Sequence, residues 1–213
     1  MTLRVNVVGA AGLGTRVLML IHGYGADEHD LAGLTPALDP EGRFFTVCPR
    51  GPLDVEPYGG ASWYHFTDHG PDPATFQGSL IELDHLLDAV CEHRGAQRSE
   101  VVVAGFSQGG SMALALALRR SGKARPAAAL CLSGFLHQPD WLEYDWRAPD
   151  LPPVWVQHGT HDPMLPAERG RRSASTLEQH GVDVTYREYP MQHEIRPECI
   201  TDLRSWLRQR IGG

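Results

Sequence analysis

The sequence lacks the features that mark a secreted or membrane-spanning protein. Its longest apolar runs, residues 17–21 and 101–105, are far too short to cross a bilayer. Residues 1–16 contain no apolar signal segment followed by a cleavage site, so we expect no export. The 4 cysteines are scattered and form no Cys-x-x-Cys pair, which is typical of buried free thiols in a reducing compartment. These absences predict a cytoplasmic protein with no membrane span.

An excess of basic residues is also absent. The chain has 19 Lys and Arg against 26 Asp and Glu, a formal net charge of −7. Binding of phosphate backbones needs clustered cations, so this balance disfavours nucleic acid as a partner. The length of 213 residues and a hydrophobic fraction of 42% predict one globular domain, residues 1–213.

The pattern of apolar residues predicts an α/β fold. Short β-rich runs alternate with helical patterns, which is typical of βα units and a mostly parallel sheet. Continuous apolar runs such as VVVAG and AAALCL indicate strands covered by helices on both faces. About seven strands are expected, at residues 3–8, 17–21, 44–48, 101–104, 127–132, 154–157 and 184–189. Helices are expected at residues 77–94, 108–120 and 167–180, and from Pro197 onward.

Three segments fall outside this alternation. Residues 9–14 resemble a dinucleotide-binding glycine loop, but the next segment reads as a strand rather than the required helix. We therefore predict a hairpin turn there and no nucleotide cofactor. Residues 49–75 and 135–153 are long and rich in aromatic residues, as binding loops often are. For residues 135–153, a surface loop folded on its own aromatic side chains is an equal alternative.

The strongest chemical signal is Ser107, in the G-x-S-x-G sequence of residues 105–109 between a buried strand and a buried helix. A serine hydroxyl is a poor nucleophile that must be exposed, aimed and close to a base. A sharp strand-to-helix turn exposes it, and the flanking glycines let neighbouring segments pack closely. The helix start directs free amides, including that of Gln108, at developing negative charge. Ser107 is the predicted nucleophile.

The acid and the base of a triad follow the serine in the order typical of this turn. Asp162 comes directly after one predicted strand and His193 just after the last, so both lie where parallel strands end. His193 is the predicted base and Asp162 the acid that orients it. The alternatives that remain open are His158 and His161 as the base, and Asp183 and Glu194 as the acid.

A second amide is needed to bind the oxyanion. The sequence His22-Gly23-Tyr24-Gly25 follows a predicted strand. A turn of this type presents a backbone amide in many enzymes that use a serine nucleophile on a strand-to-helix turn. We predict the Tyr24 amide as the partner of the Gln108 amide. His22 is expected to brace the loop.

Taken together, LIHGYGADEHD, CPRGP, GGASWY, GFSQGGSMAL, LSGF, HGTHDPMLP and YPMQHEI resemble the phospholipase/carboxylesterase family, which includes the acyl-protein thioesterases. The resemblance implies a compact α/β-hydrolase with the same triad and oxyanion amides. It also implies that Trp63 is the family's loop aromatic residue near the acyl site and that Leu165 takes an apolar position after the acid, and it allows a homodimer. The chain departs from the family at Gln192, where glycine is usual before the histidine. Gln192 could narrow the approach to His193 or bind a polar substrate.

These observations predict a serine hydrolase that cleaves small-molecule or lipid esters, or thioesters, through an acyl-enzyme and without a cofactor. Lysophospholipase and acyl-protein thioesterase activities are the alternatives within this class. A metallohydrolase is a remote alternative, because His158, His161 and Asp162, and the group from His22 to Asp30, look like metal ligands. A non-catalytic binding protein is another. Apolar candidates for the substrate pocket are Trp63, Phe66, Phe135 and Leu165.

Overall fold

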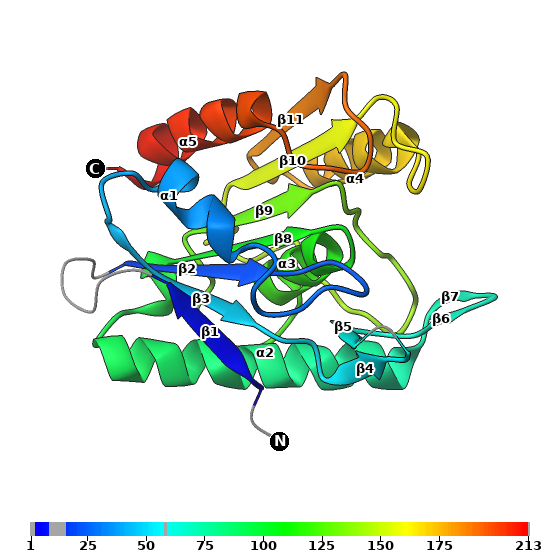
Figure 1. Cartoon of the computed structure of the whole chain (residues 1–213), viewed down its shortest axis with the longest axis horizontal. Coiled ribbons are helices and arrows are strands. Elements are labelled where there is room, and N and C mark those ends of the chain that lie inside the picture. The colour runs from blue at the N-terminus through cyan, green and yellow to red at the C-terminus, as the bar shows by residue number, and fades with distance from the viewer. Residues whose placement is uncertain (1–2, 9–15, 58, 213) are drawn as a thin grey trace.

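A seven-stranded sheet forms the centre of the computed structural model, which describes residues 3–8, 16–57 and 59–212 (Figure 1). The strand order is β1-β3-β2-β8-β9-β10-β11. Six strands are parallel, and β1 at the edge pairs antiparallel with β3. The strands are β1 (Val5–Val8), β2 (Arg16–Ile21), β3 (Phe44–Pro49), β8 (Val101–Phe106), β9 (Ala128–Leu132), β10 (Val154–Gly159) and β11 (Val184–Tyr189). The predicted α/β class and all seven predicted strands are confirmed.

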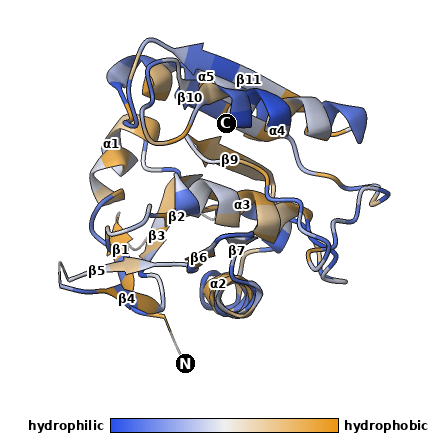
Figure 2. Ribbon diagram, turned by 90° about the vertical axis from the view of Figure 1, so that its right-hand side faces the viewer, coloured by the Kyte–Doolittle hydropathy of each residue, from blue (hydrophilic) through white to orange (hydrophobic). Residues whose placement is uncertain are grey.

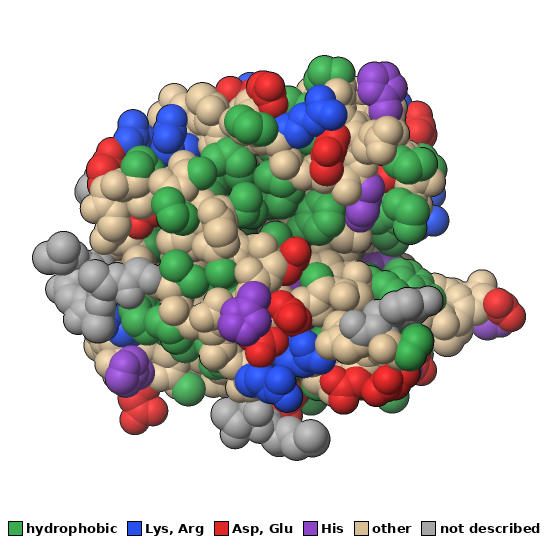
Figure 3. Space-filling model, viewed as in Figure 1, with side chains coloured by type: hydrophobic (Ala, Val, Ile, Leu, Met, Phe, Trp, Pro, Cys, Tyr) green, Lys and Arg blue, Asp and Glu red, His purple; other side chains and the backbone are tan. Residues whose placement is uncertain are grey.

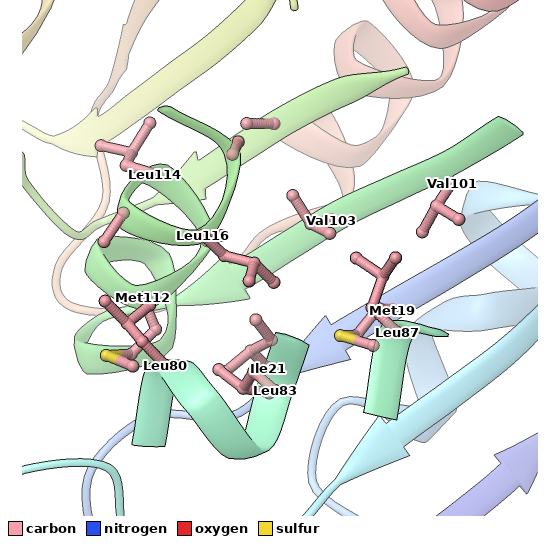
Figure 4. Packing of buried hydrophobic residues seen from close by; sticks show 14 of the residues in the cluster. Met19, Ile21, Leu80, Leu83, Leu87, Val101, Val103, Met112, Leu114 and Leu116 are labelled. Carbon is pink, nitrogen blue, oxygen red and sulfur yellow. The ribbon is translucent and has the colours of Figure 1, made fainter. Parts of the chain in front are cut away.

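Helices cover both faces of this sheet. Alternate residues of a strand point to opposite sides, and both sides of these strands are apolar, so each face packs against helices. Met19 and Ile21 of β2 pack in one cluster with α2, α3 and α4, as Figure 4 shows for α2 and α3. Leu18 and Leu20 pack in the other cluster, with α1 and α5. Figure 2 shows the contrast in hydropathy between the buried α3 and the surface helix α4. The helices are α1 (Thr35–Leu38), α2 (Pro73–Arg94), α3 (Gln108–Leu118), α4 (Ala167–Gln179) and α5 (Pro197–Ile211).

The helix ends follow local chemistry. The Asp72 side chain accepts a hydrogen bond from the Thr75 amide at 2.8 Å, so it caps α2 immediately before Pro73. The helix ends at Gly95, whose φ of 64° is in the left-handed region that glycine adopts without strain. α2 therefore begins four residues earlier than the apolar pattern predicts, because its first turn is defined by a cap rather than by buried side chains.

The long segment of residues 49–75 contains structure that the sequence pattern does not predict. Two small antiparallel sheets form there, β4 (Leu53–Val55) with β5 (Gly60–Ser62), and β6 (Phe66–Thr67) with β7 (Gly70–Pro71). The β6–β7 hairpin projects from the body at the right of Figure 1, and the same projection in Figure 3 ends in acidic and histidine side chains.

The two strands that the predicted hairpin turn at residues 9–14 would join do not pair with each other. These residues lie outside the described part of the chain, but the strands on either side of them are described. β1 pairs with β3 rather than with β2, because β3 lies between them in the sheet. None of the described helices combines the length and the apolar character needed to cross a membrane.

Candidate active site

Ser107 lies at the turn from β8 into α3, in a strained backbone conformation. Its φ of 53° and ψ of −117° are unfavourable for a residue with a side chain, at a cost on the order of 1–3 kcal/mol. Its amide is held by a 2.8 Å hydrogen bond to the carbonyl of Leu132 on β9. A Cβ at Gly105 would collide with the backbone of Gly109, and one at Gly109 with the backbone of Ile21. The glycines of the motif thus permit the tight packing that holds this turn.

Asp162 and His193 meet across the loops that follow the neighbouring parallel strands β10 and β11. The His193 Nδ1 atom lies 2.6 Å from Asp162 Oδ2, which leaves Nε2 as the free ring nitrogen. Asp162 Oδ1 accepts hydrogen bonds from the amides of Met164 and Leu165, both at 2.8 Å. Burial alone would raise the pKa of Asp162, but the hydrogen bonds from Leu165, His193 and Met164 outweigh it and lower that pKa. Asp162 is therefore ionised and oriented toward His193.

The alternative acids and bases lie elsewhere. His158 is buried on β10, with Nε2 2.8 Å from the Leu165 carbonyl and 3.4 Å from Asp162 Oδ2. Burial lowers the pKa of His158, so it lies beside Asp162 as a neutral ring. His161 is exposed. The two alternative acids bind arginines: Asp183 pairs with Arg210, and Glu194 with Arg196.

The turn after β2 brings a second backbone amide to the same edge of the sheet. Among the described residues, neither the Tyr24 amide nor the Gln108 amide donates to an acceptor. His22 fixes this turn: its Nδ1 donates to the Gly23 carbonyl at 2.6 Å, and its Nε2 accepts from the Gly51 amide at 2.9 Å. Burial lowers the pKa of His22, which agrees with a neutral ring that braces the loop.

A cavity of about 210 Å³ opens beside Ser107 and His193. Three apolar side chains on its wall are largely exposed: Tyr24 at 59%, Phe66 at 58% and Met164 at 71%. The sequence pattern does not single out Tyr64, Ser111 and Met164, although they lie in the quoted motifs GGASWY, GFSQGGSMAL and HGTHDPMLP. The wall as a whole is formed by Tyr24, Tyr64, Phe66, Ser107, Gln108, Ser111, Phe135, Met164, Leu165 and His193.

Two residues predicted near the substrate are absent from the described wall of the cavity. Trp63 is 0% exposed and is not among the described residues of the cavity wall. Its Nε1 donates to the His22 carbonyl at 2.9 Å, so it supports the wall from behind, because this polar partner draws the ring inward. Gln192 is exposed on the His193 loop, and its amide donates to Glu194 at 3.2 Å. It is not among the described wall residues either.

The ligand-like clusters of the sequence do not converge in the described part of the chain. There, no three His, Cys, Asp or Glu side chains form a group that could hold a metal ion. His158 points into the core while His161 is at the surface.

The sequence and the fold match known hydrolases. The family model for phospholipase/carboxylesterase matches residues 4–211, and the chain belongs to this family of α/β-hydrolases. It is therefore an enzyme, a carboxylesterase-type hydrolase. A solved carboxylesterase from Mesorhizobium loti is 20% identical and superimposes with a TM-score of 0.83, covering 96% of this chain and 94% of the other.

Two curated relatives agree. Acyl-protein thioesterase 1 of Gibberella zeae is 33% identical over 230 aligned positions, which cover 96% of this chain and 94% of the relative. Lysophospholipase-like protein 1 of Mus musculus is 32% identical over 153 positions, covering 65% of this chain and 63% of the relative.

Proposed function

We propose that the protein cleaves carboxylic esters or thioesters with Ser107 as nucleophile, His193 as base and Asp162 as the orienting acid. The observation that carries the proposal is the 2.6 Å contact between His193 and Asp162 on a cavity that Ser107 also lines. The strained turn at Ser107 and the low pKa of Asp162 support it. No step of this reaction needs a cofactor.

Each group has one task in the reaction. His193 Nε2 takes the Ser107 proton as Oγ attacks the carbonyl carbon, and Asp162 stabilises the imidazolium that forms. The Tyr24 and Gln108 amides donate to the oxyanion, and the α3 start adds its positive end. His193 then protonates the leaving alkoxide or thiolate, and the acyl-enzyme is left. Water activated by the same His193 releases the acid and restores Ser107.

The cavity favours small esters among the possible substrates. Its volume of about 210 Å³ is below the roughly 300–1,000 Å³ common for ligand pockets, and its rim is apolar and open. A short acyl or aryl group fits within such a space. A longer chain extends along Phe66 and Met164 at the rim, so acyl-protein thioesterase and lysophospholipase activities remain the second candidates. The names of the curated relatives support them.

Hydrolysis of p-nitrophenyl esters from acetate to palmitate, by the native protein and by Ser107→Ala, tests the proposal. We expect a short-chain optimum that is absent in the variant. A long-chain optimum would favour lipid or lipidated-protein substrates. Equal activity of the two proteins would refute Ser107 as nucleophile.

Three further properties belong to this proposal. One sheet serves both hydrophobic clusters, which supports a single domain over residues 1–213. All four cysteines are free and buried, which supports a reducing, cytoplasmic setting. The homodimer stays a prediction, tested by the mass of the protein in solution.

A further inference from the structure

A second, larger hollow of about 520 Å³ adjoins the candidate active site. Phe135 lines both spaces, so the two hollows share this residue as a common wall. The second hollow continues over the first turns of α4, where Arg169 and Arg172 reach it. A ligand that extends from Ser107 past Phe135 therefore meets these two arginines.

The two arginines are arranged as a pair. They are three residues apart on α4, so they project from the same side of the helix. The Arg169 guanidinium lies over the Phe135 ring, 4.5 Å from its centre. A guanidinium over an aromatic ring is attracted to the face of the ring, and its N–H groups can still donate to an anion.

Neither arginine is neutralised in the described part of the chain, where no carboxylate forms an ion pair with Arg169 or Arg172. Glu168 also lines the hollow, but its carboxylate binds Arg171 at 2.6 Å. The buried His137, the other titratable wall residue, has a pKa lowered to about 4 by burial and then by Arg169, so it is uncharged at neutral pH. The hollow is therefore positive, in a chain whose net charge is −7.

We infer that this hollow is an anion subsite, which binds a carboxylate or a phosphate at the far end of the ester substrate. The inference rests on the proposed function, because it takes Ser107 as the point where the ester bond lies. Guanidinium groups bind carboxylate and phosphate through paired N–H donors, and the apolar ring of the half-buried Phe135 beside them strengthens the attraction. The subsite would select esters with a negative charge at one end and an apolar segment at the other. The charged end would bind the arginines, and the apolar segment would occupy the cavity beside Ser107.

Binding to the Ser107→Ala protein tests the subsite without turnover of the ligand. Two matched pairs are measured: p-nitrophenyl hydrogen suberate against its methyl ester, and octanoylglycerol phosphate against octanoylglycerol. We expect the anionic member of at least one pair to bind about tenfold more tightly, as charge-assisted hydrogen bonds allow. This preference should shrink in about 0.5 M salt, because the arginines are exposed. The pair that shows it tells whether carboxylate or phosphate is the preferred group.

Variants assign the preference to these residues. Arg169→Gln with Arg172→Gln should abolish the preference. The neutral member's Kd should stay within about twofold, because both side chains are exposed and the contact of Arg169 with the Phe135 ring is replaced by the glutamine stem. Arg172→Gln alone leaves Arg169 in contact with Phe135 and should remove part of the preference for the anionic ligand. The control, Arg187→Gln, removes one exposed arginine of β11 that is not among the described residues of either hollow, and it should retain the preference.

Equal binding within both pairs, no binding of any of the ligands, or a preference that survives the double substitution would overturn the subsite. Failure of the proposed function is a separate result: the native protein would then hydrolyse neither neutral ester, whatever the binding shows.

Discussion

The edge of the sheet and the two long loops above it form opposite kinds of structure around one cavity. At the edge, backbone hydrogen bonds and glycine contacts hold Ser107, and hydrogen bonds from two amides hold Asp162. Between the two loops, side chains make the contact: Tyr64 of the first loop binds His137 of the second at 2.9 Å. The comparison teaches that the proposed chemistry rests on main-chain geometry, whereas the shape of the cavity rests on side-chain pairs.

The largest effect is expected at the nucleophile. Ser107→Ala should lower kcat by about 10³–10⁶, because the members of a triad act as a unit. Ser133 is a matched control: it also has a φ of 53°, it follows the adjacent strand β9, and its buried hydroxyl has no partner among the described residues. Ser133→Ala should leave kcat within about threefold. Steady-state hydrolysis of p-nitrophenyl butyrate measures both, and equal losses would contradict the assignment.

The next effect concerns the acid. Asp162→Asn should lower kcat by about 10⁴ or less, because an amide NH₂ facing Nδ1 selects the wrong His193 tautomer. The amides of Met164 and Leu165 would still find an acceptor in the asparagine, so the loop should stay folded. Asp183→Asn, at the rival acid, should leave kcat unchanged. The same assay decides, and an active Asp162→Asn protein would mean that another group orients His193.

The loops are expected to respond to pH through His137. Burial lowers its pKa from the ordinary 6.5 to about 4, so the unfolded chain binds this proton more readily than the folded protein does. The free energy of unfolding is therefore unaffected by this group above pH 6.5. It falls by about 3 kcal/mol as the pH falls from 6.5 toward 4. Urea unfolding at pH 7 and pH 4.5 measures the loss. His137→Gln should lose less stability than the native protein over that interval, and an equal loss would refute this role.

The smallest effect is expected at the rim of the cavity. Phe66→Ala removes a ring that is 58% exposed, so it should raise KM for long-chain esters about fivefold and leave kcat unchanged. Ile81→Ala, at a similarly exposed apolar residue of α2, is the control and should change neither constant. A fall in kcat for Phe66→Ala would show that the loops also govern the chemistry, and the contrast with the sheet edge would fail.

The sequence predicts the edge of the sheet far better than the loops, for a physical reason. Strands such as Val101–Phe106 are continuous apolar runs, and the glycines around Ser107 answer a steric need of the backbone, so both leave local signals. The insertion of β3 between β1 and β2 leaves no local signal, because it depends on pairing between distant segments. Trp63 and Tyr64 are neighbouring aromatic residues, yet one lies behind the cavity wall and the other within it. Their different positions follow from their hydrogen-bond partners: the Trp63 ring donates to the His22 carbonyl, and the Tyr64 hydroxyl binds the His137 ring.

The side chain of Gln108 joins these two regions. Its Oε1 accepts from the Trp63 amide at 2.8 Å, and its Nε2 donates to the Tyr64 carbonyl at 2.7 Å, while Gln108 itself lines the cavity. A change of backbone at residues 63–64 would therefore be transmitted to the turn that carries Ser107. Beyond Tyr64, the hairpin that bears Phe66 has no such tie to Gln108. Substitutions at residues 65–71 are therefore the ones expected to change the substrate range with the least effect on Ser107. A library confined to these residues would sample new specificities without disturbing the reaction.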